Sequence, residues 1–254
     1  MFTMDKTAFL ILSVWAAVFL GLVKCDVSLN KCHFSERRHH VQVVYESSAG
    51  TKKCAGTLIH KLWVITAKDC YGGIDGTLKV KLSDQKKPLV IKSSDVVSSL
   101  NEPILLLKLP KYVLNIKPAL LPSGDCMTPE EGDELQVSGY SFTKTEGDVN
   151  TNLMCLDVQV SNCADLPETD SAKYKRVFCG KKSEDISGQN DYGSGFLAKK
   201  LKKRKITRKV KQTDTLFGVL IDAQPNQLIF YSICHQETKN WLDGTLKPKR
   251  FRLL

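Results

Sequence analysis

The chain has 254 residues, of which 42% are hydrophobic and 25% are charged. This composition is close to that of an average folded domain and excludes a collagen-like, coiled-coil or disordered chain. The 37 Lys and Arg residues outnumber the 27 Asp and Glu residues, and the resulting formal charge of +10 favours anionic partners.

An apolar segment near the N-terminus predicts a secretory signal peptide. Residues 8–23 contain no charged side chain, and Lys6 and Lys24 flank them. This run is short for a membrane span and fits the central region of a signal peptide. We therefore predict a signal peptide over residues 1–25, cleavage after Cys25, and secretion of the remaining chain, with storage in secretory granules also compatible. An uncleaved signal anchor is the alternative.

The cysteine count agrees with secretion. The chain has nine cysteines, and cleavage after Cys25 leaves eight. An even number in a secreted protein indicates up to four disulfides. No Cys-x-x-Cys pair is present, which disfavours a zinc site, and the sequence predicts neither a metal nor a cofactor. Spacing alone leaves the disulfide pairing open.

Short apolar runs separated by turn residues predict an all-β domain. They are rich in Val, Ile and Leu, as is typical of antiparallel strands in a sandwich or barrel. A terminal helix is predicted over residues 235–245, which contain Trp241 and Leu242. The nine predicted strands are 41–45, 63–67, 78–82, 89–91, 104–109, 135–139, 156–160, 217–221 and 228–233.

Residues 199–211 concentrate the positive charge. From Asp26 onward the chain has 35 Lys and Arg against 26 Asp and Glu, so the nine cations of this run equal the whole excess. Their spacing resembles that of heparin-binding clusters, and many cations on a short segment bind a polyanion by releasing counterions. The nine are Lys199, Lys200, Lys202, Lys203, Arg204, Lys205, Arg208, Lys209 and Lys211.

We predict that this run binds heparin, another glycosaminoglycan or a bacterial envelope. An anionic membrane surface or a protein partner also fits the charge. A solvated loop and a processing or targeting site are the alternatives. No aromatic residue interleaves the run, so specific nucleic-acid recognition is not expected. Residues 244–254 form a second basic segment, and His39 and His40 would add charge at low pH.

Five stretches, in order along the chain, resemble segments of trypsin-like serine proteases. Residues 54–70 resemble the segment around the catalytic histidine, and residues 103–109 resemble the aspartate strand. Residues 137–140 resemble the Ser-Gly-Trp segment, residues 177–195 the approach to the catalytic serine, and residues 230–242 the last strand and helix. Because the stretches keep the family order, they imply a fold of two six-stranded antiparallel β-barrels with a short C-terminal helix.

This resemblance implies domain limits and a disulfide pattern. The family domain would span residues 26–243, with a first barrel at about 40–125, a second barrel at about 130–235 and residues 244–254 as a tail. All eight remaining cysteines would find partners. The implied pairs are Cys32–Cys155, Cys54–Cys70, Cys126–Cys234 and Cys163–Cys179.

The same resemblance implies that the catalytic triad has been replaced. Asp69 stands at the histidine position, Pro103 at the aspartate position and Tyr192 at the serine position. A carboxylate cannot reproduce the two-ended role of an imidazole, and proline has no side-chain acceptor. A phenol with a pKa near 10 is a poor nucleophile without an activating base. We therefore predict that the chain is not a protease.

Other positions of the cleft are also altered relative to the family. Ile186 stands at the base of the specificity pocket, and residues 221–223 replace the strand that pairs with substrate. Asn190 replaces the glycine of the oxyanion hole. Ser194 and Glu102 lie near the serine and aspartate positions, but neither has a histidine to act with.

The resemblance also assigns a role to the mature N-terminus. Asp26 falls where the activated N-terminus of the family would sit, and Asp191 matches the aspartate that pairs with that terminus. A structural latch between the Asp26 amine and Asp191 is one hypothesis. A frayed terminus with an exposed Asp191 is the other.

Two inactive relatives of the family supply the functional hypotheses. Azurocidin lost its triad and acts through basic surfaces, which implies anion binding and an antimicrobial role in innate immunity. The protease-like chain of haptoglobin resembles residues 66–69 and 190–196, which implies a scavenger or protein-partner binder that uses the barrel loops. We predict a secreted pseudoprotease that binds polyanions, with the partner binder as the alternative.

Overall fold

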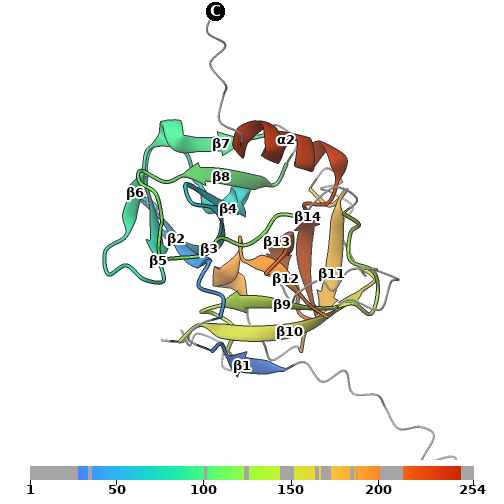
Figure 1. The fold of residues 1–254 in the computed structure, drawn as a ribbon. Coiled ribbons are helices and arrows are strands. Elements are labelled where there is room, and N and C mark those ends of the chain that lie inside the picture. The colour runs from blue at the N-terminus through green and yellow to red at the C-terminus, as the bar shows by residue number, and fades with distance from the viewer. Residues whose placement is uncertain are drawn as a thin grey trace, which may run out of the picture.

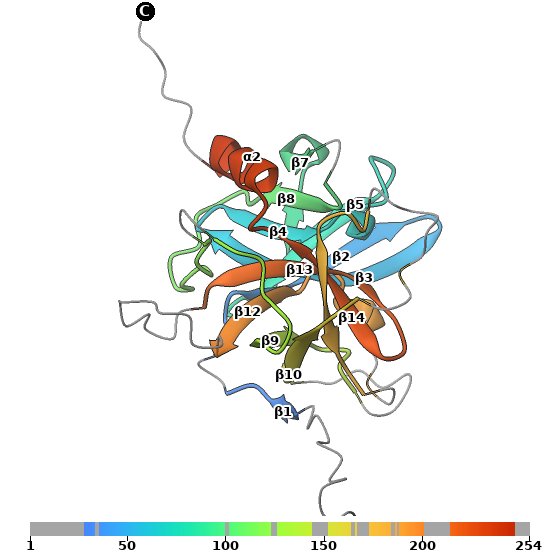
Figure 2. The same cartoon turned by 90° about the vertical axis from the view of Figure 1, so that its right-hand side faces the viewer.

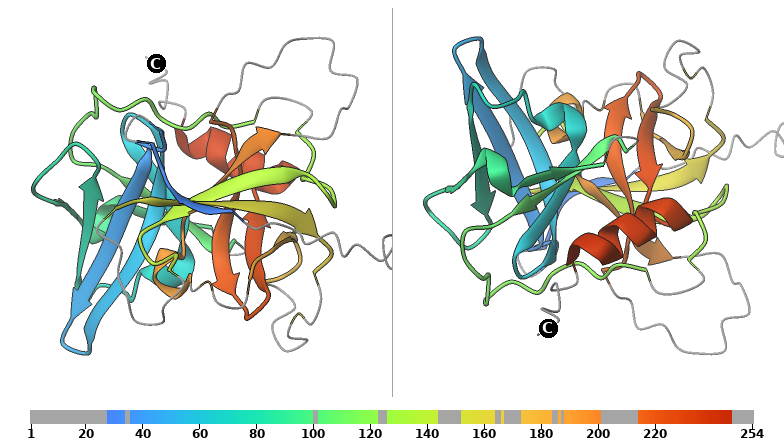
Figure 3. Two further views of the ribbon diagram at one scale, coloured as in Figure 1. Left: turned by 90° about the horizontal axis from the view of Figure 1, so that it is seen from below. Right: turned by 90° about the horizontal axis from the view of Figure 1, so that it is seen from above.

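A computed structural model of the chain describes residues 28–33, 36–99, 102–122, 126–143, 152–163, 173–183, 188–200 and 214–246, together with Leu166 and Ile186. These residues are mostly β and form two sheets that lie side by side (Figures 1 and 2). The views from below and above in Figure 3 show the first sheet on one side and the second on the other. None of the helices within these ranges is long and apolar enough to cross a membrane.

The first sheet has seven antiparallel strands in the order β6-β5-β2-β3-β4-β8-β7. No ladder between β6 and β7 occurs in the described part of the chain, so the sheet curls without closing. The 3-10 helices η1 (Lys68–Cys70) and η2 (Ser93–Asp95) lie between its strands. The strands are β2 (His40–Ser47), β3 (Gly50–His60), β4 (Trp63–Ala67), β5 (Thr77–Leu82), β6 (Leu89–Ile91), β7 (Val96–Ser98) and β8 (Ile104–Lys108).

The second sheet forms a closed barrel, because β9 pairs with both β10 and β12. The order is β9-β10-β11-β14-β13-β12, and β1 adds to β10 outside this ring. The 3-10 helix η4 (Gln189–Asp191) precedes β12, and the helix α2 (Gln236–Leu246) follows β14. The strands are β1 (Leu29–Lys31), β9 (Glu134–Gly139), β10 (Met154–Ser161), β11 (Val177–Lys181), β12 (Gly195–Lys200), β13 (Leu216–Ala223) and β14 (Gln227–Ser232).

The predicted all-β fold with one C-terminal helix is confirmed. All nine predicted strands occur, with ends that differ by two residues at most, and the predicted helix occurs one residue later. The first sheet differs from the expected six-stranded barrel, because its short edge strands β6 and β7 are separated by the turn at η2. Sequence patterning missed β1, β3, β7, β11 and β12. The strand β3 lacks alternation, since its first four residues are exposed and the next six are all buried.

Two packing patterns build the core. In β5 the alternating residues Leu78, Val80 and Leu82 are buried, as expected for a strand with one face toward the core. In the second barrel Phe196 and Phe230 stack with ring centroids 3.9 Å apart. Four disulfides add covalent links, and their pairs are the four that the family resemblance implied: Cys32–Cys155, Cys54–Cys70, Cys126–Cys234 and Cys163–Cys179.

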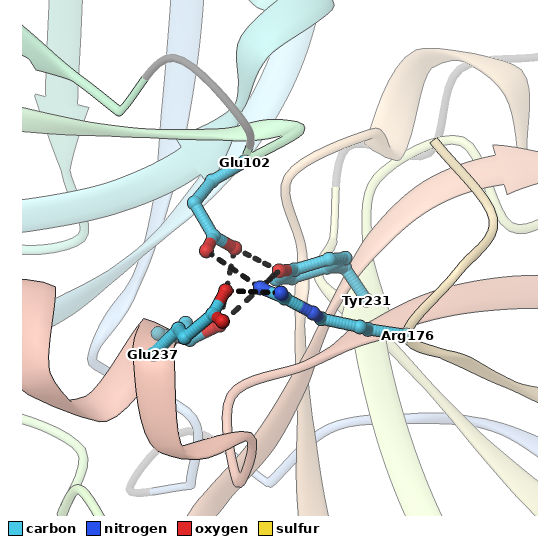
Figure 4. Close-up of polar contacts among 5 residues, drawn as sticks. Glu102, Arg176, Tyr231 and Glu237 are labelled. Atoms are coloured by element: carbon cyan, nitrogen blue, oxygen red, sulfur yellow. Dashed lines mark hydrogen bonds and ion pairs between the residues drawn. The ribbon is translucent and has the colours of Figure 1, made fainter. Parts of the chain in front are cut away.

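A buried carboxylate joins the two sheets and the helix. Glu102 precedes β8 and is 4% exposed. Its carboxylate accepts hydrogen bonds from Arg176 Nη1 at 3.0 Å, from the Tyr231 hydroxyl on β14 and from the Thr238 hydroxyl on α2 at 3.1 Å. Arg176 also pairs with Glu237 at the start of α2 (Figure 4). Three stretches distant in sequence, around residues 102, 176 and 231–238, therefore meet around one carboxylate.

Two adjacent histidines are buried where β2 begins. His39 and His40 are 3% and 4% exposed, and their Nε2 atoms have no hydrogen-bond partner among the described residues. Burial lowers the pKa of His39 to about 4. Burial, with a smaller contribution from His39, lowers the pKa of His40 to about 3. Both rings are therefore neutral well below their ordinary titration range, and the expected charge at low pH does not form there above about pH 4.

Removing the cation from the Glu102 network should lower the free energy of unfolding more than removing both members of the ion pair. In Arg176→Met the carboxylate stays buried without its charged partner, and we expect the free energy of unfolding to fall by about 3–5 kcal/mol. The double variant, Arg176→Met with Glu102→Gln, buries no unpaired carboxylate. Its free energy of unfolding should therefore fall less than that of Arg176→Met. Urea titrations of the parent, both single variants and the double variant measure this coupling. Lys173→Met, which breaks an ion pair with the largely exposed Asp69, is the control and should cost about 1 kcal/mol or less.

Acid should destabilise the fold through His39 and His40. Unfolded histidine has a pKa of about 6.5, so the unfolded chain takes up protons first. The free energy of unfolding therefore falls as the pH drops from about 6.5 through about 4 for His39 and about 3 for His40. Asp191 acts in the opposite sense, because its folded pKa is raised to about 6 from 3.8. The stability lost through the two histidines exceeds the stability gained through the one carboxylate, so the net effect of acid is destabilising. Urea titrations across this pH range should show a shallower fall for His40→Leu, and an unchanged slope would contradict this account.

Candidate functional site

The structure brings the three predicted triad positions together where the two sheets meet. Asp69 lies in η1, and the amide of the preceding Lys68 donates to the carbonyl of Pro103 at 2.8 Å. Tyr192 follows η4, and its carbonyl accepts from the amide of Ala55 on β3 at 2.8 Å. The predicted positions thus come from both sheets and converge at their junction.

A glycine permits this close approach. Gly193 has φ +92°, and a Cβ at this position would lie 2.1 Å from the carbonyl oxygen of Ala55 and 2.3 Å from Oγ1 of Thr66. Its amide donates to the carbonyl of Leu220 at 2.7 Å. The turn after Tyr192 therefore requires glycine both for its backbone conformation and for the space between the sheets.

The surroundings of Tyr192 oppose ionisation of its phenol. Burial raises the pKa of Tyr192, and the charges of Asp222 and then Asp69 raise it further. Asp222 accepts a hydrogen bond from the Tyr174 hydroxyl at 2.7 Å. Asp69 is largely exposed and forms an ion pair with Lys173 at 3.2 Å. Because negative charge disfavours a phenolate, Tyr192 stays protonated at neutral pH.

Ser194 and Glu102 lie near the predicted serine and aspartate positions, and both are engaged inside the protein. Ser194 is 0% exposed, and its hydroxyl donates to the carbonyl of Ser138 at 2.9 Å. Glu102 is held by Arg176, Tyr231 and other partners in the network described above. Each group therefore has a structural role in this conformation.

Asp191 is also buried and well bonded. Its carboxylate accepts from the amides of Tyr140 at 3.0 Å and Ser141 at 2.7 Å, and from the Ser141 hydroxyl at 2.6 Å. Burial raises its pKa to about 6, although these hydrogen bonds act to lower it. The expectation of an exposed Asp191 is therefore wrong. Asp26 lies outside the described residues, so its pairing with Asp191 stays a prediction.

A small pocket lies beside Asp191, between the two sheets. It encloses about 150 Å³. Asn190, at the predicted oxyanion-hole position, is exposed. Ile186, at the predicted specificity-pocket position, is 2% exposed and packs into the core of the second barrel. The described residues include no cluster of three or more His, Cys, Asp or Glu that would hold a metal ion. The pocket is lined by Gln42, Val44, Lys53, Cys54, Tyr140, Ser141, Asn190 and Asp191.

The basic run begins at the end of β12. Lys199 and Lys200 are the last residues of this strand, and β13 runs antiparallel beside it, with Leu197 opposite Leu216. The signal peptide at 1–25 and residues 247–254 of the tail lie outside the described residues. So do the other seven predicted contacts, Lys202, Lys203, Arg204, Lys205, Arg208, Lys209 and Lys211.

Arg37 binds Asp214, the first described residue after the basic run, and also Gln136 on β9. Arg37 has φ 53°, is 9% exposed and donates from Nη1 to Asp214 at 2.6 Å and from Nε to Gln136 at 2.8 Å. The carbonyl of Asp214 accepts from the amide of Leu120 at 2.9 Å. The sequence does not predict these contacts of Arg37, because their members are distant in the chain and no local pattern marks a buried arginine.

Comparison with known proteins gives a consistent family. The trypsin family model matches residues 27–206. Trypsin II-P29 of Gallus gallus is 29% identical over 139 residues, which are 48% of this chain and 54% of that protein. Snake venom serine protease 2B of Craspedocephalus gramineus is 30% identical over 166 residues, 59% of each chain. The chain thus matches little more than half the length of these relatives.

Solved structures show the same fold at low identity. A structure of GrC has a TM-score of 0.66 and 16% identity, and covers 87% of this chain and 99% of its own. Human heparin binding protein has a TM-score of 0.60 and 16% identity, and covers 86% of this chain and 95% of its own. At such identity the likeness concerns the fold alone. The family model covers more than half of the chain, and the chain therefore belongs to the trypsin family.

Proposed function

We propose that this trypsin-family chain is a secreted, non-catalytic protein that binds polyanions through the basic run 199–211. Its ligand would be a heparin-like glycosaminoglycan or a bacterial envelope, in a host-defence role. One observation carries the proposal: nine cations lie in thirteen consecutive residues and equal the net charge of the chain from Asp26 onward. The run begins with the last two residues of β12, a strand of the second barrel.

The state of the triad positions supports the absence of catalysis. Acyl transfer needs an activated nucleophile and a base. Burial first, and then the neighbouring carboxylates, raise the pKa of Tyr192 and keep its phenol protonated. Ser194 is fully buried and donates its hydroxyl proton to a backbone carbonyl. Neither side chain meets the requirement in this conformation.

The covalent structure supports secretion. Four disulfides are stable in an oxidising compartment and are rare in the cytosol. The predicted leader at residues 1–25 would deliver the chain to such a compartment. Storage in secretory granules is compatible with the same route. Human heparin binding protein shares the fold, which makes polyanion binding on this scaffold a natural hypothesis to test.

A partner binder or scavenger that uses the barrel loops is the second candidate. The pocket beside Asp191 favours it, because β2, β3, the residues after β9 and η4 line this pocket, and it contains the exposed Asn190. At about 150 Å³ the pocket would hold one side chain of a protein partner rather than a drug-sized ligand.

The protein from Asp26 onward should not hydrolyse peptides. Chromogenic peptide substrates with basic, aromatic and small residues before the scissile bond should show the rate of buffer alone, and a fluorophosphonate probe should not label the protein. Active trypsin is the positive control. Hydrolysis that disappears in Tyr192→Phe or in Ser194→Ala would overturn the non-catalytic proposal.

Neutralising the run should weaken binding to immobilised heparin. Replacing Lys202, Lys203, Arg204 and Lys205 by serine removes four charges and should lower the salt concentration needed for elution, because fewer counterions are released on binding. The matched control replaces four exposed lysines of the first sheet and its turns, Lys52, Lys81, Lys86 and Lys87.

Both variants have the same net charge, so they should elute together from a plain cation exchanger and separately from heparin. If the two variants also elute together from heparin, the run is a solvated insertion. The partner-binder hypothesis then takes its place.

A further inference from the structure

The surface segment that follows β8 carries both lysines and exposed apolar side chains, and the proposed function above does not use it. Residues 109–119 follow β8 and run along the tip of the β3–β4 hairpin, in the direction opposite to the end of β3. Three backbone hydrogen bonds hold them there, from Leu109 to Leu62 at 2.8 Å, from Val113 to Lys61 at 2.9 Å and from Ala119 to Leu58 at 2.8 Å.

The hairpin and the segment together gather cations on this surface. Lys61, Lys108, Lys111 and Lys117 are all exposed. The sequence contains no Asp or Glu between residues 103 and 122 or between residues 56 and 68. The hydrogen bonds above bring Lys61 beside the segment, although Lys61 is distant from it in sequence.

Asp95 lies at the edge of the sheet beside this surface. Asp95 precedes β7, which pairs with β8 so that Val96 lies opposite Leu107. This register places Asp95 near Lys108. The two form no ion pair within 4.0 Å in the described structure. The surface therefore keeps a positive balance.

Large apolar side chains project between the lysines. Tyr112 is 63% exposed and Leu114 is 74% exposed, whereas Val113 and Ile116 are buried. The buried residues anchor the segment and leave the other two facing solvent. Among the described residues, six large hydrophobic side chains are exposed, and three of them lie between Tyr112 and Leu120. Single exposed apolar residues are ordinary on proteins, but such a grouping marks a contact surface.

We propose that Lys61, Lys108, Lys111, Lys117, Tyr112 and Leu114 form a docking surface for an anionic lipid bilayer. The lysines match the negative headgroups, and tyrosine and leucine enter the boundary between headgroups and acyl chains. A sulfated polysaccharide would satisfy the lysines but offers no apolar phase for Leu114. This surface shares no residue with the run 199–211 and does not depend on that run's proposed function.

Vesicle co-sedimentation tests the proposal. The vesicles contain about one third phosphatidylserine in phosphatidylcholine, or phosphatidylcholine alone, at physiological salt. The charge variant is Lys111→Ser with Lys117→Ser, and its matched control is Lys86→Ser with Lys87→Ser near the opposite edge of the sheet. Each lysine at an anionic surface changes the partition coefficient roughly five-fold, so the charge variant should lose about 25-fold and the control far less.

An apolar variant and a spectroscopic probe test insertion. Tyr112→Ser with Leu114→Ser keeps the charge and should lower binding to the anionic vesicles by at least about ten-fold. In Tyr112→Trp the added emission should be quenched by lipids that carry bromine on their acyl chains. Since all these side chains are exposed, the variants should unfold in urea like the parent, which separates lost binding from lost folding.

The basic run 199–211 could itself bind anionic vesicles, so its contribution must be removed. All vesicle measurements are repeated with Lys202, Lys203, Arg204 and Lys205 replaced by serine, so that failure of either proposal is visible independently. Equal partition of the charge variant and its control would overturn the bilayer proposal. So would unaltered binding of the apolar variant, or unquenched emission of Tyr112→Trp. If the charge variant and its control separate on heparin but not on vesicles, the surface is a polysaccharide site and the bilayer proposal is wrong.

Discussion

The buried charge of Glu102 is the constraint on which the arrangement of the molecule depends. A carboxylate taken out of water is costly unless its oxygens are bonded and its charge is paired. That requirement is met by Arg176 before β11, Tyr231 on β14 and Thr238 on α2. These three side chains reach Glu102 only when their segments come together at the start of β8. The network therefore selects one relative placement of the two sheets and the helix. It lies next to Pro103, at the position where the family resemblance places the catalytic aspartate.

At the junction of the sheets the polar groups are bonded within the protein. Gly193 still allows the turn after Tyr192 to press against β3. Ser194 and Asp191 donate to or accept from neighbouring backbone groups. A site that satisfies its polar atoms internally gains stability and leaves few free groups for a substrate. This balance agrees with our proposal that the function lies on the surface rather than in the cleft.

Both proposed surfaces use charge in a way that needs little geometric precision. The run 199–211 concentrates cations along the sequence, whereas the surface around Lys61 and Lys111 concentrates them by folding. Binding through many cations tolerates variation in the ligand, because counterion release depends on charge density rather than on directed hydrogen bonds. Anionic polymers and anionic bilayers are ligands of this kind. The apolar residues Tyr112 and Leu114 are what would distinguish one from the other.

The sequence by itself determined the strands with clear alternation, such as β5, the terminal helix, the basic run and the positions Asp69, Pro103 and Tyr192 that meet at the junction. These features depend on local periodicity, on composition or on motif order. Only the tertiary structure decided that the second sheet closes while the first does not, that Glu102 is saturated by partners from other segments, and that Lys61 joins the lysines after β8. The physical reason is that burial and pairing in these cases involve residues far apart in the chain, and no local pattern encodes which distant segment will supply the partner.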